Sequence, residues 1–157
     1  MLHGTESIQS LLIPIRDDHL VLPNAAVAEV VFFSAIEPME NTPSWLLGML
    51  AWRNLSVLVV SIEAAINEDI PPPSHHKQKY AVLKALGNDP SFRFFAIRTE
   101  GIPQLVRIDK STISPVPDEM EATPFVLKHV FVNEKTAMIP NLDNIEDKVK
   151  EVLRAVV

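Results

Sequence analysis

The sequence contains no cysteine and only four glycines among its 157 residues. Without cysteine, the chain cannot form a disulfide framework, a thiolate nucleophile, an iron–sulfur cluster or a cysteine-containing zinc site. It also lacks a Gly-rich phosphate loop, a Gly-x-Ser-x-Gly nucleophile elbow and a His-Glu-x-x-His helix. The commonest motif-bearing classes of enzyme are therefore not indicated.

Positive charge is also in deficit, because 14 Lys and Arg residues stand against 20 Asp and Glu residues, for a net charge of −6. Such a protein repels phosphate backbones and anionic lipid, so an OB-like nucleic-acid binder is disfavoured. Residues 92–95 form the only alternation of aromatic and basic side chains. No run approaches the roughly 18 apolar residues of a membrane helix, and Met1–Glu6 do not resemble a signal peptide. We expect a cytoplasmic protein with no nucleic-acid partner and no membrane insertion.

The apolar runs that are present are short, β-branched and bounded by turn residues, which is typical of strands. Residues 11–16 and 20–23 flank Asp17-Asp18 and predict a hairpin, and a further strand follows at 26–33. Asn41 to Gly48 looks like one capped helical turn, with Pro43 at its first position and Gly48 at its exit. Thereafter the pattern predicts strands at 49–52 and 55–60 around an Arg53-Asn54 turn, and a short helix over 62–67.

Three prolines and a run of polar residues predict an exposed connector at about 68–79. Strands resume beyond it, at residues 80–86, 92–98, 104–108, 126–132 and 135–139. The similar strand content on the two sides predicts a single mainly β domain over 1–157 with two barrel-like subdomains, at about 8–67 and about 80–140. Apolar residues at helical spacing predict a C-terminal helix at about 142–156, with Glu146, Lys150 and Glu151 on its solvated face.

Several clusters of titratable residues are of the types found at catalytic or metal sites, but their surroundings in the sequence do not favour either role. The pairs Glu68/Asp69 and Glu119/Glu121 lie in polar, Pro-rich segments, where nothing would shift a carboxyl pKa. His75 and His76 would point to opposite sides of an extended loop, with no third metal ligand nearby in the sequence. The His76–Lys79 spacing is that of a phosphotransfer helix, but the prolines just upstream oppose a helix. We therefore predict no catalytic residue, no cofactor and no metal.

The segment from Asn41 to Ser61 resembles the CheW-like family of chemotaxis adaptor proteins. Pro43, Gly48 and Arg53 fall in register with that family's pattern, and residues 27–30 match its apolar-x-Glu-apolar strand at the expected distance upstream. The resemblance is clear over residues 8–67 and compatible in strand order through residue 156.

The resemblance implies a mainly β fold of two five-stranded, SH3-like β-barrels packed together with a C-terminal α-helix, and no catalytic activity. It implies a scaffold that couples the cytoplasmic tip of a chemoreceptor to the regulatory domain of a CheA-type histidine kinase. The family's receptor-binding positions correspond to Val27, Glu29, Gly48 and Arg53. Arginine is also enriched among interface anchors, whereas Trp45 and Trp52, which lie beside apolar residues, are expected in the core.

This sequence departs from the family pattern at three positions, with Asn54 in place of Gly, Leu58 in place of Pro and Ser61 in place of Asp. Asparagine tolerates positive φ better than other non-glycine residues, so the turn after Arg53 can be retained. The departures suggest a divergent member that could serve a pilus-type or other specialised array. The alternative is a β-barrel enzyme or small-ligand binder that uses the cleft between the two subdomains.

Overall fold

The computed structural model describes residues 7–32, 34–67, 78–117 and 123–156. The first half contains β1 (Ile8–Ile15), β2 (Asp18–Pro23), the 3₁₀ turn η1 (Asn24–Ala26), β3 (Val27–Phe32), β4 (Glu37–Pro38), β5 (Leu46–Trp52), β6 (Leu55–Val60) and α1 (Ile62–Ile66). The second half contains β7 (Lys79–Lys84), β8 (Phe94–Thr99), β9 (Gln104–Ile108), β10 (Ile113–Pro115), β11 (Val126–Val132), β12 (Lys135–Pro140) and α2 (Leu142–Val156).

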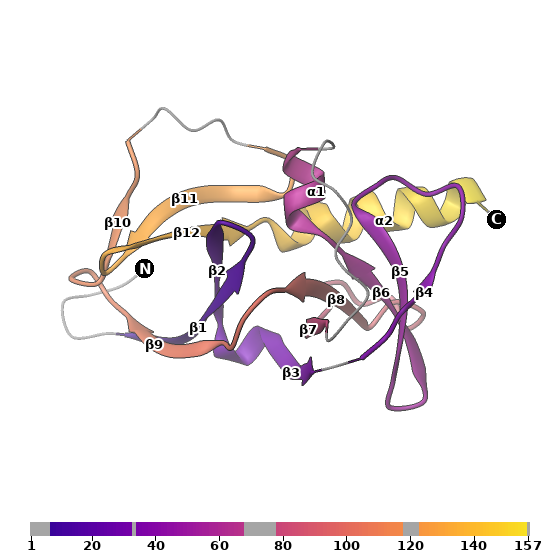
Figure 1. Cartoon of the computed structure of the whole chain (residues 1–157), viewed down its shortest axis with the longest axis horizontal. Coiled ribbons are helices and arrows are strands. Elements are labelled where there is room, and N and C mark those ends of the chain that lie inside the picture. The colour runs from indigo at the N-terminus through magenta and orange to yellow at the C-terminus, as the bar shows by residue number, and fades with distance from the viewer. Residues whose placement is uncertain (1–6, 33, 68–77, 118–122, 157) are drawn as a thin grey trace.

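The described strands form two sheets (Figure 1). Sheet A has the order β10-β11-β12-β2-β1-β9, and sheet B has the order β3-β7-β8-β6-β5-β4. Each sheet combines five strands of at least five residues with one shorter strand, β10 or β4. The prediction of a mainly β fold with a C-terminal helix is thus confirmed.

The strands of the two sheets interleave along the chain, so the expected division into 8–67 and 80–140 does not coincide with the sheets. In sheet A, β1 pairs with β9 and β2 pairs in parallel with β12. In sheet B, β3 pairs with β7 and β6 pairs in parallel with β8. Hairpin signals are local, whereas these pairings join distant strands, which is why the sequence pattern did not reveal them.

The predicted hairpins are present, and their turns carry the backbone conformations that tight turns need. Asp17 and Asn133 have φ of 62° and 56°, and Arg53 and Asn54 have φ of 47° and 62°. Of these turns, only Arg53-Asn54 has positive φ at both central residues, the requirement of a two-residue type I′ turn, which matches the twist of the flanking strands. Asn54 therefore performs the turn function of the glycine that it replaces.

The expected helical turn over residues 41–48 is wrong. The amide of Leu46 donates to the carbonyl of Pro43 at 3.0 Å, which closes a single turn, and β5 begins at Leu46. Gly48 lies within β5 at φ +154°, and a Cβ there would lie 2.2 Å from the carbonyl oxygen of Glu37 in β4. This glycine therefore permits the close approach of β4 rather than ending a helix.

Three apolar clusters hold the fold together. The largest lies between the sheets and beneath α2, and it joins Ile13 and Leu20 of sheet A to Phe95 of sheet B and Ile145 of α2. The second cluster is made by sheet B residues, including Leu50 and Tyr80, and the third by sheet A residues, including Leu12 and Val132. Side chains alternate between the faces of a strand, so each sheet has one face in the shared core and the other in a core of its own.

Helix α2 packs with a carboxylate buried beside its apolar face. Glu146 is only 4% exposed, and its side-chain oxygens accept hydrogen bonds from the amides of Leu86 at 2.6 Å and Gly87 at 3.2 Å. The expectation that Glu146 is solvated is therefore wrong, because the β7–β8 loop covers that part of the helix. Glu151 is exposed as expected and pairs with Lys148 at 3.3 Å.

Several predictions fall on residues outside the described ranges, namely Met1–Glu6, Glu68/Asp69, His75/His76, Glu119/Glu121 and connector residues 68–77. The last two residues of the predicted connector are described and do not fit it. Gln78 is buried, and its side-chain oxygen accepts a hydrogen bond from Nε of Arg98 at 2.7 Å, while Lys79 begins β7. Neither α1 nor α2, the two α-helices of the described part of the chain, could cross a membrane.

Candidate functional site

Two of the four predicted site residues meet at the tip of the β5–β6 hairpin. Nη2 of Arg53 lies 2.9 Å from Oε1 of Glu29, and Nε1 of Trp52 donates to the same oxygen at 3.1 Å. The guanidinium carbon of Arg53 lies 4.6 Å from the centroid of the Trp52 ring. We call these three residues the Glu29 cluster.

The Glu29 cluster depends on contacts between strands that are not neighbours in sheet B. Glu29 belongs to β3 at one end of the sheet order, whereas Trp52 and Arg53 lie where β5 turns into β6. The register of β3 shifts between Val27 and Glu29, as at a β-bulge. Bulges re-aim side chains, and the curvature of sheet B brings the aimed carboxylate to the turn.

The Arg53–Glu29 ion pair of the Glu29 cluster is exposed to water, and this exposure limits its contribution to stability. The Arg53 side chain is 64% exposed and that of Glu29 is 44% exposed. An exposed ion pair contributes only about 0–1 kcal/mol to stability because water screens it. A guanidinium has five N–H donors, so most of those on Arg53 remain available to a carboxylate or carbonyl of another molecule.

The other two predicted site residues, Val27 and Gly48, have packing roles in this structure. Val27 is partly buried against the large core between the sheets. Gly48 has no side chain and lies against β4, as described above. Neither is a member of the Glu29 cluster, and their expected role in partner binding stays a prediction.

Two departures from the family pattern have clear structural consequences. Leu58 lies in β6 between Met49 of β5 and Phe95 of β8, where proline would have no amide to donate. Ser61 caps α1, because its Oγ accepts a hydrogen bond from the amide of Ala64 at 3.1 Å. Serine and aspartate are comparable N-caps, so this substitution retains the capping interaction.

Both tryptophans were expected in the core. Trp52 is buried, and its ring meets that of Phe94 edge-on at 4.9 Å. Trp45 is partly buried and meets the ring of Phe125 at the same distance. Trp52 also orients Glu29 through Nε1, a role that was not predicted from the sequence. The position of a tryptophan immediately before the turn arginine was the available signal.

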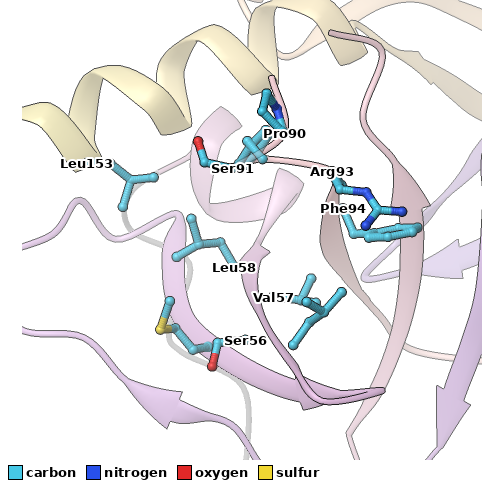
Figure 2. A pocket seen from close by; sticks show the side chains of 11 residues that line it. Ser56, Val57, Leu58, Pro90, Ser91, Arg93, Phe94 and Leu153 are labelled. Atoms are coloured by element: carbon cyan, nitrogen blue, oxygen red, sulfur yellow. The ribbon is translucent and has the colours of Figure 1, made fainter. Parts of the chain in front are cut away.

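A small pocket (Figure 2) is lined in part by Phe94, whose ring contacts Trp52 of the Glu29 cluster. It is bounded by β6, by residues 90–94 and by Leu153 of α2, and its volume is about 190 Å³. Pockets for small-molecule ligands span roughly 300–1,000 Å³, so this one is undersized for a metabolite. A second pocket of about 520 Å³ lies within sheet A, where Lys135 donates to Gln104 at 3.2 Å. Neither pocket lies between the two sheets, where the alternative hypothesis would put a ligand site.

Titratable groups in the described ranges do not assemble into a reaction centre. Burial raises the pKa of Tyr80, an effect that Arg98 partly opposes. Arg98 donates a hydrogen bond to Gln78 and lies 3.4 Å from Glu100, so its interactions are structural contacts within the protein. In the part of the chain that the structure describes, no three His, Asp or Glu side chains gather as they would around a metal ion.

The sequence model of the CheW-like domain matches residues 9–150. The structure is similar to the crystal structure of the scaffolding protein TtCheW from Thermoanaerobacter tengcongensis, with a TM-score of 0.70 and 17% sequence identity, over 87% of this chain and 90% of that one. No curated protein matches the chain in sequence. Because the family model covers most of the sequence, the chain belongs to the CheW-like domain family.

Proposed function

We propose that this protein is a non-enzymatic, cytoplasmic adaptor that couples chemoreceptors to a CheA-type histidine kinase. Membership of the CheW-like domain family supports an adaptor role in chemosensory signalling. The interleaved strands of sheets A and B support a single CheW-like domain rather than two separable ones. The Glu29 cluster supplies a surface on which such an adaptor could bind the tip of a receptor.

One observation carries the proposal, namely that Arg53 is exposed and yet held in place. Its guanidinium is fixed by Glu29 at 2.9 Å and by the Trp52 ring at 4.6 Å. An arginine held in this way loses less side-chain entropy when a partner binds, because part of that entropy is already lost in the free protein. Arginine and tryptophan are also the residues most often found at interface hot spots.

Val27 and Gly48 complete the proposed receptor-binding surface in a supporting role. Gly48 allows β4 to lie against β5, and Val27 packs at the start of β3 next to the bulge that aims Glu29. Substitutions at either position would therefore alter binding through the shape of sheet B. A second surface would bind the regulatory domain of the kinase.

Arg53→Glu tests the proposal. We expect unfolding free energy to fall by less than about 1 kcal/mol, because only an exposed ion pair is lost. We expect binding to a receptor cytoplasmic fragment to weaken by about 2 kcal/mol or more, because a carboxylate would then face the partner beside Glu29. Urea unfolding measures the first quantity, and co-sedimentation with receptor and kinase measures the second.

Arg107→Glu is the matched control, because Arg107 is an exposed arginine on β9 of sheet A and its reversal changes net charge equally. It should leave receptor binding unchanged. Arg53→Gln, which removes the charge but keeps a donor near Glu29, should give an intermediate loss. If folded Arg53→Glu protein co-sediments like the wild type, the Glu29 cluster is not part of the receptor-binding surface.

A further inference from the structure

The pocket of Figure 2 is linked to the Glu29 cluster by one shared neighbour, Phe94, which lines the pocket and contacts Trp52. The Trp52 ring meets Phe94 at 4.9 Å, and the guanidinium carbon of Arg93 lies 5.5 Å from the centroid of Phe94. Arg53 and Arg93 therefore cover neighbouring aromatic rings, and Phe94 and Arg93 line the pocket. We call this pocket the β6–α2 pocket.

The size and lining of the β6–α2 pocket suit one bulky apolar side chain. Leu58, Phe92 and Leu153 contribute apolar walls, and Leu55 at its edge is 42% exposed. Its volume of about 190 Å³ is similar to that of an apolar cavity, roughly 150 Å³, known to hold a benzene molecule. Leucine, methionine and phenylalanine side chains are of this size class.

The edge of the β6–α2 pocket is positively charged, although the whole chain carries a net charge of −6. Arg93 is exposed, and among the described residues no carboxylate lies within ion-pair distance of it. On the α2 side, Lys150 lies 3.9 Å from Asp89, and Arg154 follows the pocket residue Leu153. A partner segment with negative charge next to its apolar side chain would complement this edge.

The walls of the pocket are held in place by interactions in the interior. Glu146 of α2 binds the amides of Leu86 and Gly87 in the β7–β8 loop, and Nζ of Lys150 lies 5.4 Å from the centroid of the Phe92 ring. The loop and the helix that both line the pocket are thus tied to each other. When a pocket is already formed in the free protein, binding does not have to include the entropic cost of ordering its walls.

We propose that the β6–α2 pocket receives a bulky apolar side chain from a protein segment in which acidic residues flank that side chain. The proposal rests on the adaptor function only in assigning the pocket to a protein partner. It adds a contact for a partner segment of defined chemistry, made by residues that are not members of the Glu29 cluster. Apolar burial would supply affinity, and Arg93 and Arg154 would select acidic neighbours.

The test uses the ¹⁵N-labelled full chain and a short synthetic peptide with one leucine between glutamates. Amide resonances of Ser56, Ser91 and Phe94 should shift and saturate as the peptide is added, and that of Ser111 should not. Ser111 is a stringent reference because its local hydrogen bonds are the same as those of Ser91. Oγ and the amide of Ser111 donate to Asp109 at 2.6 and 2.8 Å, and Oγ and the amide of Ser91 donate to Asp89 at 2.7 and 2.9 Å. Peptides with serine for leucine, or lysine for glutamate, should bind at least about tenfold more weakly.

Two variants locate the binding. Ser56→Phe places a ring in the pocket from an exposed strand position, and Arg93→Glu reverses the charge at its edge. Each should weaken the peptide at least about tenfold. The matched controls, Ser114→Phe on β10 and Arg107→Glu on β9, should leave peptide affinity unchanged. An unaltered remainder of the amide spectrum shows that each variant is folded.

Three outcomes would overturn the proposal. The first is the absence of shifts around the pocket at millimolar peptide; the second is equal binding of the glutamate and lysine peptides. The third is that the amide resonances of the pocket residues shift with protein concentration when no peptide is present, which would identify a second copy of the chain as the occupant. Failure here is distinguishable from failure of the adaptor function, since the receptor co-sedimentation of Arg53→Glu does not involve this peptide.

Discussion

The molecule uses carboxylates in two kinds of region, buried junctions between elements and exposed ends of sheets. At the junctions, Glu146 joins α2 to the β7–β8 loop, and Glu63 of α1 accepts a hydrogen bond from the amide of Arg16 at 2.9 Å. Both are about as buried as the core, at 4% and 5% exposure. At the sheet ends, Glu29 and Asp89 accept comparable hydrogen bonds from exposed side chains.

The difference lies in what replaces the bond when it is lost. Water can solvate an exposed donor, so the loss of an exposed hydrogen bond costs little. A buried amide without an acceptor keeps its full desolvation penalty of about 1–3 kcal/mol. Buried carboxylates therefore maintain the architecture, whereas exposed ones can exchange partners without unfolding the protein. This comparison predicts a graded series of effects.

The largest effect is expected for Glu146→Ala. The substitution leaves the amides of Leu86 and Gly87 without their acceptor and detaches the β7–β8 loop from α2. Leu86 and Gly87 are exposed residues, so water can solvate their amides in part, and we expect the free energy of unfolding in urea to fall by about 1–3 kcal/mol. Glu151→Ala on the same helix removes only the exposed pair with Lys148 and should cost no more than about 0.5 kcal/mol. Equal losses for the two variants would refute the comparison.

An intermediate effect is expected for Ser61→Asp, which restores the residue typical of the family. Aspartate caps a helix as well as serine does, but Oγ of Ser61 lies 3.3 Å from Oε1 of the buried Glu63. Two carboxylates at that distance repel each other, so we expect a loss of about 1–2 kcal/mol at neutral pH. Ser61→Asn caps without added charge and should unfold near the wild-type urea midpoint. A Ser61→Asp protein as stable as Ser61→Asn would show that the Glu63 site tolerates a second charge.

The smallest effect is expected for Ser91→Ala at an exposed carboxylate. The side-chain and backbone hydrogen bonds from Ser91 hold the pKa of Asp89 below its ordinary value, with a smaller contribution from Lys150. Loss of the hydroxyl should raise that pKa, as an NMR titration of the Asp89 carboxyl would report. A lowered pKa in the folded state gives stability that is present above the unfolded pKa and lost as the pH falls through the folded pKa. At neutral pH the urea midpoint of the variant should therefore stay close to that of the wild type, because Asp89 is accessible to water.

Local chemistry was predictable from the sequence wherever neighbours along the chain determine it. The Arg53-Asn54 turn follows from a residue that tolerates positive φ, and α2 follows from apolar residues at helical spacing. The first hairpin was predicted, but its turn lies one residue earlier than expected, at Arg16-Asp17, with Asp18 already paired in β2. The segment from Asn41 to Gly48 carries the same kinds of residue as a capped helical turn, but pairing with β4 and β6 draws Leu46 to Gly48 into a strand. Tertiary pairing thus overrides a weak local signal.

The candidate site was predictable only in part, because its contacts cross the sheet. The resemblance to the CheW-like family supplied Glu29 and Arg53, and the structure brings these two side chains together. The third member, Trp52, was predicted to lie in the core because it is next to apolar residues, and it is indeed buried. Glu146 was placed on a solvated face because charged helix residues usually are, and no local pattern revealed the loop that covers it.

The interleaving of the strands also bears on how the chain reaches its native state. Neither the part before residue 68 nor the part after residue 77 contains a complete sheet, since β1 needs β9 and β3 needs β7. A chain cut between these parts would yield two fragments with unpaired strand edges, prone to aggregate alone and able to fold only by complementing each other. Sheet B can close only after β8 (Phe94–Thr99) has been made and sheet A only after β12 (Lys135–Pro140), so neither sheet can form from the first half alone, and folding should be slow for a protein of this size.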